Sequence, residues 1–226
     1  IKYLKMLRAK QVDGLIVFPT GENVRVYEEI VNERFPLVFV DRTVEGLNVD
    51  SFLLDNEKAS SLAVNHFIDK GHWNIGIITT SLARKVTPRV ERIEGYKKTL
   101  KINGIEPREE YIKSLELCEI KNGLKEMMAL RDPPTAVLAG NDLVLMEILN
   151  FTKENNLRIP DDLAVIGIDD VSFSNIFDPP LTTISHPTFE MGKKAAQLLL
   201  KKIEGKEYRE GKIHRFNPTL NIRHSC

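Results

Sequence analysis

The chain has 226 residues, enough for one large or two small domains. Hydrophobic residues make up 42% and charged residues 28%, a composition typical of globular domains. The 32 Lys and Arg are balanced by 32 Asp and Glu, so the chain as a whole is not a polyanion binder. This balance argues against direct DNA contact by these residues.

The cysteine count and the apolar runs bear on the compartment. Cys118 and Cys226 are too few for a disulfide framework and favour a reducing, cytoplasmic environment. No apolar run reaches the length of a membrane span, and there is no signal peptide. The chain opens inside a helical pattern without a Met, which predicts a piece of a longer protein that extends N-terminally.

Short apolar runs alternate with amphipathic segments along the whole chain. Helices are predicted up to residue 11 and at 22–34, 56–70, 88–103, 122–130, 143–155 and 188–204. Strands are predicted at 15–18, 36–40, 50–54, 75–78, 111–117, 135–139, 163–168 and 181–184, with an extended tail at 213–216 and 220–224. This alternation predicts an α/β fold with parallel sheets, in one sheet or two lobes.

Several residues mark the expected ends of these helices. Asn56 and Thr188 are suited to cap helix N-termini, and Pro88 suits a first helical turn. Gly71, Gly104 and Gly205 follow periodic segments, where a left-handed residue ends a helix.

The segment 159–184 carries the clearest local signal. Leu163–Ile168 is an apolar run of the kind buried on both faces of a parallel sheet. The run stops abruptly at Asp169 and Asp170, at the carboxyl end of the strand, where open α/β sheets bind ligands.

The same position is repeated elsewhere. Asp41, Asn141 and Asp169, and also Phe18, each follow an apolar run at the carboxyl end of a predicted strand. Loops at these ends face the binding crevice of a parallel sheet, so these residues are candidate ligand contacts. The alternative is that the polar residues only start turns or cap helices.

Arg89 and Arg92 form a second signal. They lie three residues apart near the start of a predicted helix, where a cation opposes the helix dipole. Because arginine's planar fork suits vicinal hydroxyls or a carboxylate, both are candidate ligand contacts. With Arg84 or Lys85 nearby, the ligand could be acidic. The alternative is a surface ion pair with a neighbouring glutamate.

Signals for an enzyme are poor. The five histidines show no metal-ligand spacing, and there is no phosphate-binding glycine loop or nucleophile motif. Adjacent carboxylates such as Asp169 and Asp170 face opposite ways in a strand and form no ready acid–base pair. We therefore predict no catalytic site, no metal and no cofactor.

A series of segments resembles landmarks of one family in order and spacing. The segments are VDGLIV (12–17), FPLVFVDR (35–42), GHWNIGII (71–78), RIEGY (92–96), PPTAVLAGNDL (133–143), IPDDLAVIGIDD (159–170) and PPLTTI (179–184). Together they resemble the effector-binding domain of the lactose-repressor/galactose-repressor (LacI/GalR) family of bacterial transcription regulators.

The resemblance implies a fold like that of type I periplasmic binding proteins, with two Rossmann-like three-layer lobes. One lobe would comprise residues 1–54 plus 187–206, lacking its first strand, and the other 55–186 plus 207–226. It also implies that Asp41, Arg92, Asn141, Asp169, Phe18 and Arg89 contact a ligand in the inter-lobe cleft.

The implied function is that of a repressor's sensor domain, which binds a small sugar or sugar acid. The DNA operator would be bound by an N-terminal helix-turn-helix absent from this chain, and the protein would form a homodimer. A periplasmic sugar-binding protein of a transporter has the same fold and is the alternative. A nucleotide-dependent α/β enzyme is a third possibility, but this sequence lacks the phosphate-binding loop that such an enzyme needs.

Overall fold

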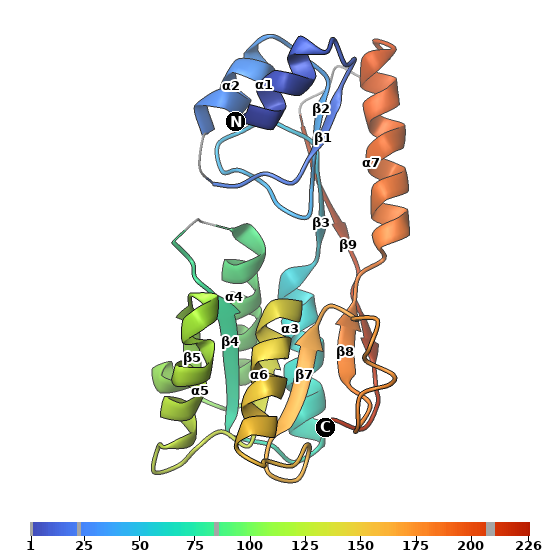
Figure 1. The fold of residues 1–226 in the computed structure, drawn as a ribbon. Helices are drawn as coiled ribbons and strands as arrows, with labels where there is room; N and C mark the ends of the chain where they lie inside the picture. Colours follow the sequence, from blue (N-terminus) through green and yellow to red (C-terminus); the bar gives the residue numbers. More distant parts are fainter. Residues whose placement is uncertain (1, 22–23, 84–85, 207–210) are drawn as a thin grey trace. The chain divides into compact units, whose positions relative to one another are not determined.

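The computed structural model divides the chain into two compact α/β units, each built on its own sheet (Figure 1). It describes residues 2–21, 24–83, 86–206 and 211–226. The first unit contains the chain up to Leu54, a short segment ending at Pro88, and Pro187–Phe216. The second contains Asp55–Ala83, Arg89–His186 and Asn217–Cys226. Within the described residues no helix is long and apolar enough to cross a membrane.

The first unit has a four-stranded parallel sheet in the order β1-β2-β3-β9. Its elements are α1 (Lys2–Ala9), β1 (Leu15–Val17), α2 (Val24–Asn32), β2 (Leu37–Val40), β3 (Ser51–Leu54), α7 (Thr188–Ile203) and β9 (Ile213–Phe216).

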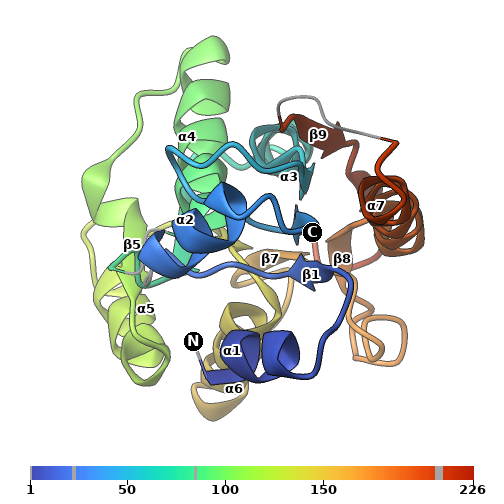
Figure 2. The same ribbon diagram turned by 90° about the horizontal axis from the view of Figure 1, so that it is seen from above.

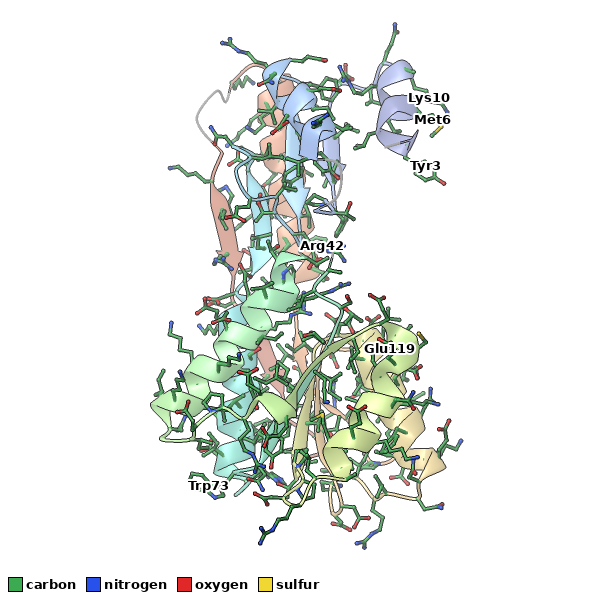
Figure 3. All side chains as sticks on the ribbon, turned by 90° about the vertical axis from the view of Figure 1, so that its left-hand side faces the viewer. Tyr3, Met6, Lys10, Arg42, Trp73 and Glu119 are labelled. Carbon is green, nitrogen blue, oxygen red and sulfur yellow. The ribbon has the colours of Figure 1, made fainter. Side chains whose placement is uncertain are left out.

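Alternation along β2 explains how this sheet is covered on both faces. Leu37 and Phe39 pack into the cluster that contains residues of α1 and α2, whereas Val38 and Val40 pack with residues of α7. On α1, Tyr3 and Met6 are exposed on the surface (Figure 3). The apolar run of β2 is thus buried on both sides, as expected for a parallel strand.

The chain tail differs from the prediction that all of residues 207–226 belong with the second lobe. All four residues of β9 pair with β3, which places this strand in the first sheet. The His214 ring stacks on Phe52 with centroids 4.5 Å apart, and Phe216 is buried against the same core. This strand has only one buried residue, so its pattern gave no indication of which sheet it joins.

The second unit has a six-stranded sheet in the order β10-β8-β7-β6-β4-β5, parallel except for β10. Its strands are β4 (Ile75–Thr80), β5 (Ile112–Leu115), β6 (Ala136–Ala139), β7 (Ala164–Ile168), β8 (Thr182–Ser185) and β10 (Thr219–Asn221). Its helices are α3 (Asn56–Asp69), α4 (Thr87–Ile102, whose first two residues belong to the first unit), α5 (Ile120–Met128) and α6 (Asp142–Glu154). Two 3-10 turns lie at Glu109–Tyr111 and Leu117–Glu119.

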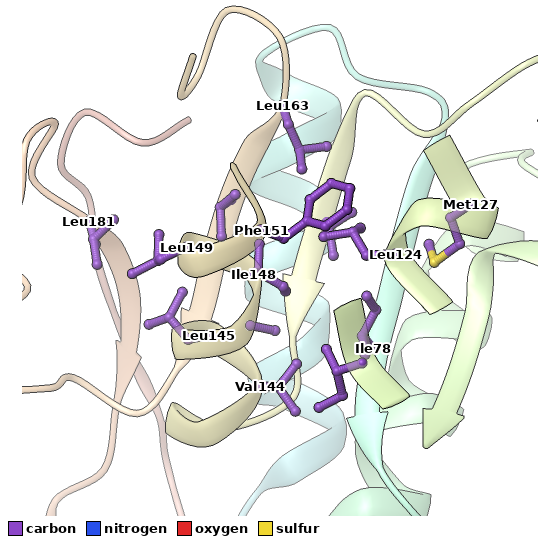
Figure 4. Packing of buried hydrophobic residues seen from close by; sticks show 14 residues of the cluster. Ile78, Leu124, Met127, Val144, Leu145, Ile148, Leu149, Phe151, Leu163 and Leu181 are labelled. Carbon is purple, nitrogen blue, oxygen red and sulfur yellow. The ribbon is translucent and has the colours of Figure 1, made fainter. Parts of the chain in front are cut away.

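The helices of the second unit cover both faces of its sheet. Figure 2 shows α3 and α4 on one side and α5 and α6 on the other. The core under α6 includes Ile148 and Phe151 against Ile78 and Leu163 (Figure 4). The four central strands of this sheet, β8, β7, β6 and β4, have nearly every residue buried. This close packing fixes the positions of their carboxyl ends.

Two helix caps differ from the sequence prediction. Asp55, not Asn56, caps α3, because its carboxylate accepts a hydrogen bond of 3.0 Å from the Lys58 N–H. Helix α7 starts at Thr188, but the capping position is Pro187, which makes no side-chain cap bond. Asn56 is fully buried within the second unit, where its side chain accepts a hydrogen bond from Arg92.

The predicted C-terminal stops are confirmed. Gly71, Gly104 and Gly205 have φ angles of +89°, +75° and +69°, each just beyond a helix. A residue with a Cβ is strained in this left-handed region, so glycine is favoured there.

Candidate functional site

The carboxyl ends of parallel strands gather polar side chains along one edge of the second sheet. Asn141 follows β6, Asp169 follows β7 and His186 follows β8. Since β6, β7 and β8 are hydrogen-bonded neighbours, their ends lie side by side at this edge. The strand-end pattern seen in the sequence therefore corresponds to neighbouring positions in this unit.

Arg92 reaches the same edge from α4. Its side chain is nearly buried, at 5% exposure. The Nε donates to Asn56 Oδ1 at 2.9 Å, and one Nη donates to the Gly140 carbonyl at 2.5 Å. Asn56 in turn donates to Glu91 Oε2 at 2.8 Å. The two bonds that Arg92 donates fix the direction of its guanidinium, and the bond to Glu91 fixes Asn56.

The turn at Gly140 allows this close approach. A Cβ at residue 140 would lie 2.8 Å from the Ile78 carbonyl oxygen, closer than real contacts. The Gly140 N–H itself donates to that oxygen at 2.7 Å. Glycine is therefore required where β6 ends beside β4 and where Arg92 binds the backbone.

Asp169 has the most constrained backbone of the site residues. Its φ is +97°, a region that non-glycine residues rarely adopt. Its N–H donates to the Ile184 carbonyl at 2.9 Å, and one carboxylate oxygen accepts from the Asp142 N–H at 3.2 Å. The other oxygen lies 3.0 Å from His186 Nε2. Strain of this kind persists only where surrounding contacts over-determine the conformation.

The charge state of Asp169 follows from these neighbours. Burial alone would raise the pKa of its carboxyl, but His186, the charge of Arg92 and the Asp142 N–H outweigh burial and lower the pKa below its ordinary value. The side chain of Asp169 is 33% exposed, so an ionised acceptor is presented to solvent at this edge. His186 is 11% exposed and supports that acceptor from one side.

Asn141 has a structural role in addition to its position. Its Oδ1 accepts a hydrogen bond of 2.9 Å from the Val144 N–H and caps α6. The alternative that such a residue caps a helix is therefore correct for this oxygen. Capping also orients the side-chain amide at the strand end.

Arg89 lies one turn before Arg92 on α4. One of its Nη atoms donates to the Ser81 carbonyl in the loop after β4, within the second unit. Its side chain is held at the same edge as Arg92. Arg84 and Lys85, which the sequence suggested as further cations, lie outside the described residues.

The first unit holds the other two candidates at the corresponding ends of its strands. Asp41 follows β2 with a φ of +67°, and its N–H donates to the Phe52 carbonyl at 2.9 Å. Its carboxylate accepts from Arg42 Nε at 3.2 Å. Phe18 follows β1 and is 63% exposed. Since β1 and β2 are paired in parallel, these two residues lie at one edge of the first sheet.

The six predicted residues thus form two groups. Arg89, Arg92, Asn141 and Asp169 belong to one edge of the second sheet, and Phe18 and Asp41 to one edge of the first. That both groups bind one ligand stays a prediction. The group at the edge of the second sheet contains the ionised carboxylate of Asp169 and the guanidinium donors of Arg89 and Arg92. Carboxylates and guanidinium groups together bind hydroxyl groups well. Among the described residues, no cluster of His, Cys, Asp and Glu could hold a metal ion.

Sequence reasoning missed two residues that belong to the group at the edge of the second sheet. His186 directly follows β8, so the strand-end rule that selected Asp169 would also have found it. Asn56, which orients Arg92, could not have been found this way. Its partner Arg92 is 36 residues away along the chain, and the local sequence indicates only a helix cap for Asn56.

Comparisons with known proteins agree on one kind of protein. A family model described as a periplasmic binding protein-like domain matches residues 64–226. The probable HTH-type transcriptional regulator EndR of Paenibacillus polymyxa is 48% identical, over 99% of this chain and 67% of the relative. The chain therefore spans about two thirds of that relative's length.

Solved structures of regulators have the same fold. A LacI family transcriptional regulator from Enterococcus faecium with bound ribose is 26% identical, with a TM-score of 0.84 over 100% of this chain and 83% of that one. The transcriptional regulator CelR in complex with cellobiose is 25% identical, with a TM-score of 0.88 over 100% and 69%. Both similarities cover the two units of the chain.

Proposed function

Because the chain belongs to the LacI/GalR family of bacterial transcriptional regulators, in which it forms the effector-binding domain, we propose that its effector is a small sugar or sugar acid. Its proposed contacts are Asp41 and Phe18 of the first unit and Arg89, Arg92, Asn141 and Asp169 of the second.

The observation that supports this proposal most directly is the ionised carboxylate of Asp169 within the electrostatic influence of the Arg92 guanidinium. An ionised, partly exposed carboxylate and a guanidinium fixed at the same edge of the sheet supply an acceptor and a donor group, as vicinal hydroxyls require. Two similar regulators were solved with ribose and with cellobiose, which agrees with a sugar. The additional cation Arg89 favours a sugar acid within that class.

Ligand binding regulates by shifting a conformational equilibrium. The effector binds one conformation of the regulator more tightly than another, and the two conformations differ in DNA affinity. Coupling of this kind is typically about 1–3 kcal/mol. The measured consequence is an operator affinity that depends on effector concentration.

Further parts of the proposal concern the full-length protein. Operator DNA is bound by a helix-turn-helix module, as the name of the relative EndR indicates, rather than by this charge-balanced chain. The protein acts in the cytoplasm and catalyses no reaction. The transporter alternative is not favoured, because the similar proteins are regulators.

We further propose that the regulator is a homodimer, and one surface of the second unit suits the contact. An open groove of about 910 Å³ runs between α6 and the loop after β7. Its rim carries Met146 and Ile176, which are 41% and 82% exposed, and Phe173 and Phe177 line it. An exposed apolar surface of this kind is typical of protein–protein contacts.

A ligand screen with matched variants tests the sugar proposal. We expect neutral sugars such as ribose and cellobiose, or sugar acids such as gluconate and galacturonate, to raise the thermal unfolding midpoint, since ligand at 100 times its Kd adds about 2.7 kcal/mol. Calorimetric titration of the best ligand should show that Asp41→Asn and Asp169→Asn each weaken binding by roughly tenfold or more, because each removes a charged acceptor.

The matched control is Asp162→Asn, which removes an exposed carboxylate paired with Arg158 in the second unit. Its affinity should equal that of the wild type. Wild-type affinity in both Asp41→Asn and Asp169→Asn would place the ligand elsewhere. A screen in which no sugar or sugar acid shifts the midpoint would reject the effector class.

A further inference from the structure

Arg223, near the end of the chain, makes a dense set of contacts below the candidate site. Its Nε donates to Asn175 Oδ1 at 2.7 Å, and one Nη donates to the Leu181 carbonyl at 2.6 Å and to Thr183 Oγ1 at 2.8 Å. The same Nη lies 3.0 Å from Asp170 Oδ1, and the other Nη donates to Oδ2 at 3.3 Å. The side chain is 15% exposed, so the guanidinium is held from several directions.

The tail that carries Arg223 is fixed to the second sheet on both sides of it. Strand β10 pairs antiparallel with β8 just before Arg223. Just after it, Ser225 Oγ donates to the Val165 carbonyl at 2.6 Å and accepts from the Thr182 N–H at 2.8 Å. The chain end is thus part of the fold beneath the strand ends rather than a loose terminus.

The partner of Arg223 is the residue next to the strained one. Asp170 also accepts hydrogen bonds from Thr183 Oγ1 at 2.7 Å and from Asn221 Nδ2 at 3.3 Å. Burial would raise the pKa of its carboxyl, but Arg223 and Thr183 outweigh it and lower the pKa. Asp170 directly follows Asp169, whose φ is +97°, so contacts that hold Asp170 also restrain the backbone of the Asp169 turn.

We propose that Arg223 is a positioning residue of the effector site: it holds Asp170 and so keeps the Asp169 turn in its ligand-binding conformation. The identity of the ligand rests on the proposed function, whereas the positioning concerns contacts within the chain and can be tested without a ligand. Nothing in the sequence marks Arg223, because its acceptors lie 40–53 residues away along the chain.

The positioning is tested in the ligand-free chain by backbone amide exchange measured with NMR. The Asp169 N–H donates to the Ile184 carbonyl, and the Asp142 N–H donates to the Asp169 carboxylate. In Arg223→Gln, we expect both amides to exchange roughly tenfold faster or more. The amide of Leu138, in the central strand β6, reports global opening. Arg158→Gln, which removes a guanidinium paired with Asp162 before β7, is the matched control and should change neither site amide.

A binding arm separates this proposal from the proposed function. With ribose, cellobiose, gluconate and galacturonate as probes, Arg223→Gln should weaken the best-bound sugar roughly tenfold, and Arg223→Lys less. If the wild type binds none of them, the sugar proposal fails, while the exchange result still decides the positioning. Exchange at Asp169 and Asp142 that rises only as much as at Leu138 would overturn it, because Arg223 would then be merely structural.

Discussion

At the scale of single residues, buried ionised groups of this protein are held by named partners. Asp50 is fully buried in the first unit and immediately precedes β3. Its oxygens lie 2.9 Å from Lys202 Nζ on α7 and 3.2 Å from His214 Nε2 on β9, and one accepts from the Lys212 N–H. Burial would raise the pKa of this carboxyl, but these partners outweigh it and lower the pKa.

We expect Asp50→Asn to lower the free energy of unfolding by about 3 kcal/mol at pH 7, because it leaves the mostly buried Lys202 charge without its counter-ion. The pKa of Asp50 in the folded state is below the ordinary aspartate value of 3.8, so this stabilisation is present above that value and is lost as pH falls through the folded-state pKa. Urea unfolding from pH 7 to 3 should show a constant difference down to about pH 5, which then shrinks.

Asp13→Asn is the control for this experiment, because Asp13 is exposed in the same unit. Its unfolding free energy should match that of the wild type within about 0.5 kcal/mol. A difference for Asp50→Asn that grows on acidification would contradict the assignment.

At the scale of elements, the contact between α3 and α4 sets the position of Arg92. A Cβ at Gly95 would lie 2.5 Å from the Glu57 carbonyl oxygen and 2.6 Å from its Cα. Both clashes are with the backbone of α3, so no side-chain rotation relieves them. Arg92, which lies one turn before Gly95 on α4, donates to Asn56 of α3. Tyr96, the residue after Gly95, donates to the Ile75 carbonyl at 2.5 Å. Glycine thus permits the helices to approach closely enough for Arg92 to reach Asn56.

We expect Gly95→Ala to lower the free energy of unfolding by about 1–3 kcal/mol, since α4 must move away from α3. Effector affinity should fall as well, because Arg92 moves with the helix. Gly192→Ala on α7 is the matched control: its Cβ would meet nothing within 4 Å. That variant should gain about 0.4–1 kcal/mol. Denaturant unfolding and calorimetric titration measure both effects, and a Gly95→Ala protein as stable as the wild type would disprove the close-contact argument.

At the scale of the whole molecule, the chain is divided between two units with separate sheets. The exposed apolar groove of the second unit, described above, suits contact with a second copy. We expect the wild type to sediment as a dimer and the double variant Met146→Asp/Ile176→Asp as a monomer, because charge on the rim opposes its burial. Analytical ultracentrifugation measures the mass directly.

The control for this variant is Ile102→Asp, a charge at a residue that is 75% exposed at the end of α4. It should leave the dimer intact. A double variant that remains dimeric would show that this groove is not the interface, whereas a monomeric wild type would reject the dimer at the concentrations used.

The sequence by itself determined the order and kind of the elements. Apolar periodicity marks the strands, and glycines such as Gly71 and Gly104 mark the helix ends, because these signals depend only on neighbouring residues. It also identified Asp169 and Asn141, since a residue that follows a buried strand must lie at the edge of the sheet.

Tertiary structure alone decided which distant segments meet. The pairing of β9 with β3 rather than with the second sheet, the contact of His186 with Asp169, and the hold of Arg223 on Asp170 each join residues separated by 17 to 162 positions. Pairing of this kind depends on how packed layers bring side chains together. No local pattern encodes it, because each residue's own neighbours are compatible with several partners.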